Sequence, residues 1–160
     1  MRPDLKLNLP EFDIRLRTVR AETEIWDAIR KRWLKLTPEE WVRQHFIRYL
    51  VEVKGVNPLF VRQELPLRLN EPGRRADIVV YGQDARPRMV VECKAPEVRI
   101  VRETLEQVGR YNMVLKVPCV AVTNGLTHYC FRYDAAAHRM LRLEEIPVYD
   151  TLNGWQPASE

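Results

Sequence analysis

Two short apolar runs, joined by a turn, constrain most strongly what this chain can fold into. The runs cover residues 76–81 and 88–94, and the connecting turn ends at Pro87. The first run contains Ile78, Val79 and Val80 in succession, which predicts a strand that is buried on both faces. A connection of this length suits a hairpin with a loose loop. The sequence therefore predicts two neighbouring strands of a buried sheet.

Three charged residues lie on these two predicted strands. Asp77 stands at the start of the first strand, and Glu92 and Lys94 stand at the end of the second. Because side chains alternate along a strand, Glu92 and Lys94 point to the same face. We therefore expect two carboxylates and one ammonium group to meet at one end of the hairpin.

This combination of groups suits a divalent metal site, and we expect Mg²⁺ or Mn²⁺ as the cofactor. Mg²⁺ prefers oxygen ligands and keeps several of its waters. Asp77 and Glu92 can each provide one carboxylate oxygen, and the backbone carbonyl of Cys93 can provide a third. Lys94 can orient an attacking water or stabilise charge on a phosphate. The alternative is a Glu-x-Lys triplet on a solvated strand, but here the triplet ends an apolar run, where exposed charges are less expected.

The wider pattern resembles the PD-(D/E)xK nuclease superfamily, and in particular the N-terminal domain of type I restriction enzyme R subunits in a stand-alone form. The matching segments are residues 36–44, 75–79, 91–96, 107–112 and 122–125. The resemblance implies a restriction-endonuclease-like fold with an αβββαβ core, and catalysis by Asp77, Glu92 and Lys94. Ala76 stands where the superfamily name implies proline. The central turns of the first helix lack the acidic residue that many members carry there, so only Glu39 or Glu40 in its first turn could serve.

Two further residues gain a role from this resemblance. Gln107 and Tyr111 stand four positions apart on a predicted helix and so share one face. A Gln-x-x-x-Tyr of this kind follows the catalytic motif in type I R subunits, where it would hydrogen-bond Lys94, the metal shell or a DNA phosphate. The alternative is a surface pair with a half-buried tyrosine.

Four residues near the predicted site have two interpretations each. Arg74 and Arg75 could bind phosphate or pair with Glu71 or Glu64. Glu64 could add a carboxylate to the metal or form an ion pair with an arginine. Asn124 belongs to a turn after a strand, where a nucleic-acid contact and simple turn chemistry are both open.

Length and composition are consistent with one globular domain. The 160 residues contain no apolar run long enough to span a membrane, and residues 1–6 lack the apolar core of a signal peptide. Cys93, Cys119 and Cys130 predict reduced core thiols in a cytoplasmic protein. The net charge is +4. Residues 14–35 are basic, which could serve phosphate binding or form a solvated face.

The predicted elements define a mixed α/β class. We expect an N-terminal extension over residues 1–35 with a short helix at 22–33, a nuclease-like domain over residues 36–150, and a loose tail from residue 151. Within the domain, Thr37 and Glu40 predict a capping box that starts a helix. Strands at 59–69, 76–81 and 88–94, a helix at 100–115, a strand at 118–123 and a closing hairpin at 127–144 follow.

The sequence therefore predicts a metal-dependent nuclease that acts on DNA. The alternative is a non-catalytic nucleic-acid-binding or assembly module that keeps the fold, and a third interpretation is a phosphohydrolase for a small phosphate ester. No phosphate-binding loop of the Walker type is present, so we expect no ATP site in this chain. A homodimer or a partner subunit stays open.

Overall fold

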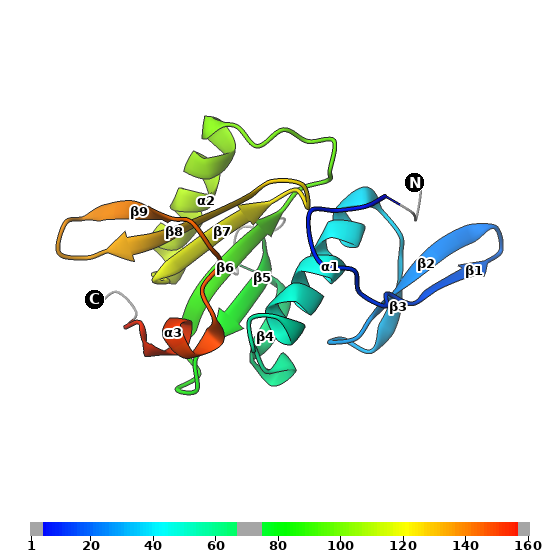
Figure 1. The fold of residues 1–160 in the computed structure, drawn as a ribbon, viewed down its shortest axis with the longest axis horizontal. Coiled ribbons are helices and arrows are strands. Elements are labelled where there is room, and N and C mark those ends of the chain that lie inside the picture. The colour runs from blue at the N-terminus through cyan, green and yellow to red at the C-terminus, as the bar shows by residue number, and fades with distance from the viewer. Residues whose placement is uncertain (1–4, 67–74, 157–160) are drawn as a thin grey trace.

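The computed structural model describes residues 5–66 and 75–156, and the predicted phosphate contact Arg74 lies outside these ranges. Two sheets and three α-helices make up this part of the chain (Figure 1). The elements in chain order are β1 (Leu16–Val19), β2 (Glu22–Asp27), β3 (Arg32–Lys35), α1 (Pro38–Glu52), a short 3-10 turn (Pro58–Phe60), β4 (Val61–Pro66), β5 (Arg75–Tyr81), β6 (Pro87–Cys93), α2 (Arg102–Leu115), β7 (Cys119–Thr123), β8 (His128–Asp134), β9 (Arg139–Leu143) and α3 (Tyr149–Gly154).

The larger sheet has the strand order β4-β5-β6-β7-β8-β9. Strands β6 and β7 are parallel, and every other neighbouring pair in this sheet is antiparallel. Helix α2 makes the crossover that two parallel neighbours require. The predicted αβββαβ order from α1 to β7 is therefore confirmed, as is the mixed α/β class.

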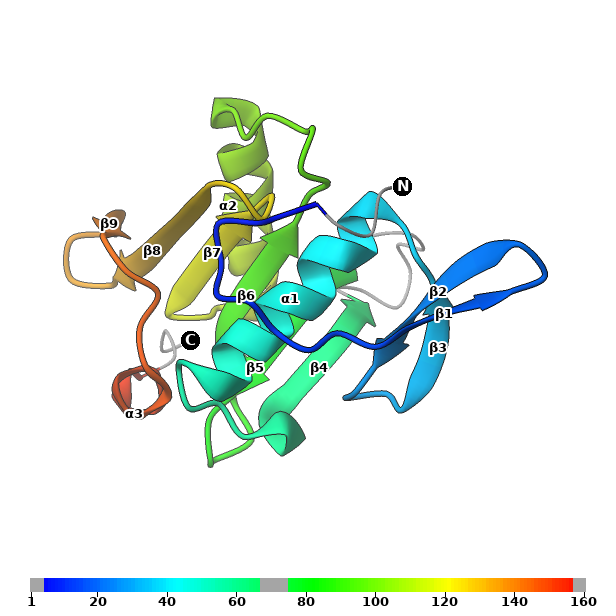
Figure 2. The same cartoon turned by 45° about the vertical axis from the view of Figure 1, so that its right-hand side comes forward.

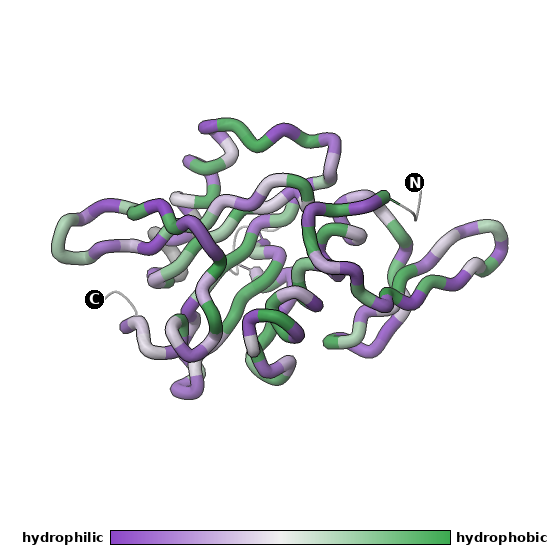
Figure 3. The backbone as a smooth tube through the Cα atoms, in the orientation of Figure 1, coloured by the Kyte–Doolittle hydropathy of each residue, from purple (hydrophilic) through white to green (hydrophobic). Residues whose placement is uncertain are grey.

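Helices cover both faces of the large sheet, so its central strands are buried on both sides. Helix α1 crosses one face and α2 lies on the other (Figure 2). On the α1 side, Phe46 packs with Ile78 and Val80 in one core cluster. On the α2 side, Val108 packs with Val79 in a second cluster. Hydrophobic residues accordingly follow the central strands (Figure 3), as the unbroken apolar run of β5 predicts.

Helix α1 begins where the sequence predicts, but its first turn differs in one respect. The hydroxyl of Thr37 accepts a hydrogen bond from the Glu40 backbone N–H at 3.1 Å, and Pro38 occupies the first helical position. The Glu40 carboxylate does not return to the cap, because it is bonded to Arg43 and Gln44. The predicted capping box is therefore only half formed.

The predicted helix at residues 22–33 is wrong. This segment forms β2 and β3, which with β1 make a separate three-stranded antiparallel sheet that we call the wing. Ile25 and Trp33 do fall at helical spacing, but the residues of this segment also fit the two-residue alternation of a β-strand. Ile25 faces the core, whereas Trp26 lies opposite Trp33 across the strands. The two-residue turn at Arg20 and Ala21, both with positive φ, fixes the first hairpin.

The predicted loose tail needs a correction at its beginning. Residues 149–154 form α3, in which Leu152 is buried. The Tyr149 ring stacks on Phe60, and its hydroxyl donates to the Tyr81 carbonyl at 3.0 Å. These contacts hold α3 against the end of β5. Residues 157–160 lie outside the described part of the chain.

Two expectations about the chain as a whole can be compared with the structure. All three cysteines are buried and free, as predicted. Among the described residues, no helix has both the length and the apolar character needed to cross a bilayer.

A buried carboxylate anchors the wing to the larger sheet. Asp27 is fully buried at the end of β2. It accepts hydrogen bonds from the backbone N–H groups of Ile29 and Arg30, from the Arg30 guanidinium at 2.6 Å and from the Gln63 amide at 3.0 Å. Burial alone would raise the pKa of Asp27, but the hydrogen bonds from Arg30 and Gln63 outweigh it and lower the pKa. The ionised carboxylate is therefore the form that the fold stabilises.

We predict that Asp27→Ala lowers the free energy of unfolding by about 3–5 kcal/mol, because it breaks the buried ion pair between Asp27 and Arg30. Chemical denaturation at neutral pH measures this loss. The matched control is Asp13→Ala at an exposed position, where the change should stay within about 0.5 kcal/mol. Equal stability of the two variants would contradict the anchoring role.

Candidate active site

Asp77 and Glu92 lie across from one another on adjacent strands. In the antiparallel pair β5–β6, Ile78 is the partner of Val91, so the next pair outward is Asp77 and Glu92. Residues that are directly opposite in an antiparallel pair project to the same face. The expected meeting of two carboxylates at one end of the hairpin is therefore present.

Glu92 carries an incompletely satisfied, buried carboxylate. Its side chain is 9% exposed, and Oε1 lies 3.4 Å from the Lys94 ammonium nitrogen. Its Oε2 atom is buried and has no hydrogen-bond partner among the described residues. Burial, and then the negative charge of Asp77, raise the pKa of Glu92 to about 8, although Lys94 acts in the opposite direction. The contact with Lys94 also confirms that the two side chains share one face.

Both carboxylate oxygens of Asp77 accept hydrogen bonds from the protein. Oδ1 accepts from the Arg43 guanidinium at 3.0 Å, and Oδ2 accepts from the Cys93 backbone N–H at 2.8 Å. Each carboxylate oxygen has two lone pairs, so these bonds leave coordination capacity on both atoms. The Cys93 contact ties Asp77 to the end of β6, beside Glu92.

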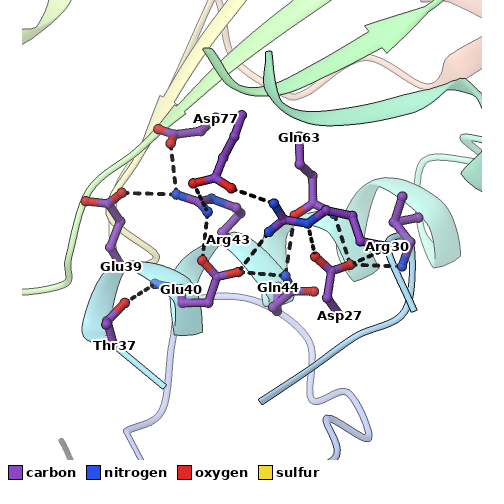
Figure 4. A network of polar contacts seen from close by, with 11 residues as sticks. Asp27, Arg30, Thr37, Glu39, Glu40, Arg43, Gln44, Gln63 and Asp77 are labelled. Carbon is purple, nitrogen blue, oxygen red and sulfur yellow. Dashed lines mark hydrogen bonds and ion pairs between the residues drawn. The ribbon is translucent and has the colours of Figure 1, made fainter. Parts of the chain in front are cut away.

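Arg43 is a central member of the site that the sequence did not single out. Its side chain is 6% exposed, and it projects from α1 into a group of carboxylates (Figure 4). Its ion-pair partners are Glu40 at 2.7 Å, Asp77 at 3.0 Å, Glu39 at 3.1 Å and Glu64 at 3.4 Å. The available signal was the spacing of three and four residues from Glu40 and Glu39, which places all three on one side of the helix.

The two acidic residues at the start of α1 have different surroundings. Burial, and then the negative charge of Asp77, raise the pKa of Glu39, whereas Arg43 and Lys94 act to lower it. Glu39 therefore lies at the edge of the site. Glu40 is buried and bonded to Arg43 and Gln44. Of the two carboxylates, only Glu39 is placed where it could join a metal site.

Glu64 belongs to an ion-pair network and we do not retain it as a metal ligand. It has a φ of 50° and lies between Gln63 and Leu65, whose register against β5 is unbroken. Its carboxylate forms ion pairs with Arg30 and Arg43. A hydrogen bond from Arg30 lowers the pKa of Glu64. The ion-pair alternative is therefore the one that the structure supports.

The remaining predicted residues are placed as follows. Arg75 is exposed at the start of β5, two residues before Asp77. Asn124 is buried, where its amide donates to the Val98 carbonyl and its oxygen accepts two backbone N–H groups, so we assign it a structural role in place of the predicted nucleic-acid contact. Gln107 is partly buried on α2. Tyr111 also belongs to α2, but its side chain lies outside the described part of the structure.

The residues present fit a divalent metal ion held by few protein ligands. The described residues include no group of three or more carboxylate, histidine or cysteine side chains placed to hold an ion. Asp77 and Glu92 form a pair, and Oε2 of Glu92 is buried with no hydrogen-bond partner among the described residues. Mg²⁺ commonly binds through one or two carboxylates and keeps several waters. The pair therefore suits this ion better than one that needs a complete protein cage.

Residues 38–147 match the family described as type I restriction enzyme R protein N terminus (HSDR_N). The chain belongs to this family. The fold of this HSDR_N domain is similar to that of a solved fragment described as a putative HsdR subunit of a type I restriction enzyme from Vibrio vulnificus YJ016. The TM-score is 0.53 and the identity is 21%, and the match covers 73% of this chain and 24% of that one. The comparison with curated proteins gives no significant match.

The raised pKa of Glu92 predicts how the stability of the HSDR_N domain depends on pH. The ordinary glutamate pKa is 4.5, and in the folded state it is about 8. Between these values the folded protein holds a proton that the unfolded chain has lost, so stability falls as the pH rises. The fall should be on the order of a few kcal/mol between pH 5 and pH 8. Above the folded pKa it should level off.

Glu92→Gln should remove this part of the pH dependence, because the amide cannot ionise. Denaturation in the presence of EDTA should show equal stability of variant and wild type near pH 4.5, and a more stable variant at pH 8. The exposed Glu97→Gln serves as the control and should follow the wild-type curve. A wild-type stability that does not decline over this range would show that Glu92 ionises normally.

Proposed function

We propose that this domain is a Mg²⁺- or Mn²⁺-dependent nuclease that hydrolyses DNA phosphodiester bonds and is related to restriction enzymes. The observation that carries the proposal is the pairing of Asp77 with Glu92 across β5 and β6, with the Lys94 ammonium group 3.4 Å from Glu92. Two carboxylates with one lysine at a single strand end supply both a metal site and a cation for the phosphate. Membership of the HSDR_N family supports the same chemistry.

Each residue in this proposal has a separate task. Asp77, Glu92 and the Cys93 backbone carbonyl would hold the ion. When bound, the ion would lower the pKa of its water and neutralise phosphate charge. Lys94 orients the attacking water or stabilises the charge that grows on the phosphate. Its ion pair with Glu92 keeps the ammonium group at the strand end.

Gln107 and Tyr111 would tune the site without being essential. Both are neutral, so neither replaces a carboxylate as a metal ligand. Their task would be a hydrogen bond to Lys94 or to a phosphate. Glu39 is the candidate for an additional carboxylate from α1, because its charge interacts with those of Asp77 and Lys94.

We infer that partners bring DNA to this site. The chain spans about a quarter of the solved fragment of a putative HsdR subunit that it matches. By analogy, a multi-subunit restriction complex or a second copy of this chain would position the DNA. The sequence itself contains no Walker-type loop, so a motor would have to come from elsewhere.

One observation favours a second candidate, a non-catalytic nucleic-acid-binding module with the same fold. The Arg43 guanidinium already lies 3.0 Å from Asp77, so the protein's own cation compensates this carboxylate. A module of this kind would have no need of a metal ion. Direct measurement of metal binding separates the two candidates.

We predict divalent metal binding that depends on Asp77. Titration calorimetry with Mn²⁺ should show one site in the wild type and none in Asp77→Asn, which keeps the shape and the acceptor for Cys93. The exposed Asp13→Asn is the control and should bind as the wild type does. Equal binding by Asp77→Asn and wild type would exclude this site and favour the non-catalytic module.

We predict that Lys94→Ala lowers the rate of DNA cleavage by about 10²–10⁴-fold, because one positioned catalytic group is removed. Metal binding and folding should persist, since the lysine is not a ligand. Cleavage is measured with Mg²⁺ on supercoiled, linear and single-stranded DNA. Lys116→Asn, at the other end of the sheet, should leave the rate unchanged. A Lys94→Ala variant that cuts at the wild-type rate would disprove the assigned role.

A further inference from the structure

The wing carries the whole net charge of the chain. Residues 14–35 contain seven Lys and Arg residues and three acidic residues, which gives a net charge of +4. The complete chain also has a net charge of +4, so the remaining residues balance one another. The positive charge is therefore concentrated on one small sheet that projects from the side of the molecule (Figure 1).

Ion pairing within the wing leaves four cations unused. Its three acidic residues are each paired: Arg17 with Glu24 at 2.5 Å, Arg30 with Asp27 at 2.6 Å and Lys35 with Glu22 at 3.6 Å. The other cations are Arg15, Arg20, Lys31 and Arg32, which are all exposed and have no ion pair with a described acidic residue. These four are available to an external anion.

Two tryptophans position arginines on the outward face of the wing. Leu16, Ile25 and Leu34 pack against the core, so the alternate residues face away from it. Trp26 and Trp33 form a cross-strand pair with ring centroids 5.2 Å apart. The Arg15 guanidinium lies 5.1 Å and 5.4 Å from the centroids of these rings, and the Arg17 guanidinium lies 4.4 Å from that of Trp33.

These contacts indicate which kind of nucleic acid would fit. A cation–π contact needs no hydrogen bond, so the stacked guanidinium keeps its N–H donors for phosphate oxygens. Ring surface that an arginine covers is not an open platform on which an unpaired base can stack. The outward face therefore suits the phosphate backbone of a duplex better than the bases of a single strand.

A continuous set of polar contacts joins the wing to the candidate active site (Figure 4). Arg30 bonds to Asp27 in the wing and to Glu64 in β4. Glu64 also pairs with Arg43, which contacts Asp77. The wing is therefore fixed beside the site, and its longest strand, six residues or about 20 Å, matches the span of several base pairs.

We propose that the wing is a docking surface for duplex DNA. It binds the phosphate backbone beside the bond to be cut. The inference rests on the proposed function, which supplies DNA as the ligand and its cleavage at the neighbouring site. The four cations without an ion pair among the described residues lie just before β1, at the start of β3 and in both turns. Contacts from such side chains to phosphate groups carry no sequence information. The wing therefore supplies binding affinity and positions the DNA on the protein. The site at the strand ends hydrolyses the phosphodiester bond.

The test compares two variants from which the same number of charges is removed. The wing variant is R15Q/R20N/K31N/R32Q, with asparagine at the two turn positions that have positive φ. The control variant is R86Q/K116N/R139Q/R142Q, which removes three arginines and one lysine from exposed positions, three of them at the far end of the large sheet. Both keep the core, and tryptophan fluorescence and melting temperature report folding.

Binding is measured in EDTA, so that affinity is read without cleavage, to a duplex of about 30 base pairs and to a single strand of equal length. We expect the wing variant to bind the duplex at least about tenfold more weakly. Its salt slope should be shallower by about 0.9 for each phosphate that the protein no longer neutralises. The affinity of the control variant should fall by less than about threefold. R15K/R20K/R32K should bind nearly as the wild type, because it keeps the charges.

Three results would overturn the proposal: an equal fall in affinity in the wing and control variants, no duplex binding by the wild type even at low salt, or tighter binding of the single strand than of the duplex. An acidic protein as the true partner would appear as the second of these. Failure of the nuclease proposal is separate, since it would appear as duplex binding that depends on the wing without any metal-dependent cleavage.

Discussion

The buried guanidinium of Arg43 is the interaction on which the site depends. Helix α1 and strands β4 and β5 each bring acidic residues to the same place, where their carboxylates would repel one another. A guanidinium that is 6% exposed and contacts four of them compensates this repulsion. Breaking a buried charge network by removing one partner is strongly unfavourable. Arg43 thus allows the helix to pack against the strand end that carries Asp77.

The same network determines how the site would receive a metal ion. Asp77 is compensated by Arg43 and by a backbone N–H group, whereas Glu92 has one buried oxygen without a hydrogen-bond partner among the described residues. Burial and the neighbouring charge raise the pKa of Glu92 to about 8. A divalent cation would satisfy that oxygen and remove the repulsion between the pair. The incompletely bonded carboxyl group of Glu92 thus lies where the proposed reaction needs an ion. Carboxyl groups with a strongly shifted pKa are typical of functional sites.

The wing and the site form one unit through Asp27, Arg30 and Glu64. The sequence shows the basic residues of the wing but cannot show which of them are paired, because the pairing requires the antiparallel register of β1, β2 and β3. Segment 22–33 also illustrates a limit of periodicity. Ile25 and Trp33 satisfy a helical spacing, while the alternation that decides the strand is spread over only six residues. Short segments leave both periods open.

Local sequence patterns were enough to predict the central strands, both main helices and the order of the αβββαβ core. They also predicted that Asp77, Glu92 and Lys94 share one strand end. These features follow from local rules, namely apolar runs, helix caps and the alternation of side chains along a strand. The surroundings of Arg43, Glu64 and Asn124 could not be predicted, because each side chain contacts a residue that is distant in the chain. The strands of the wing also depend on tertiary structure, because cross-strand pairing and contact with the core outweighed the helical spacing of residues 22–33.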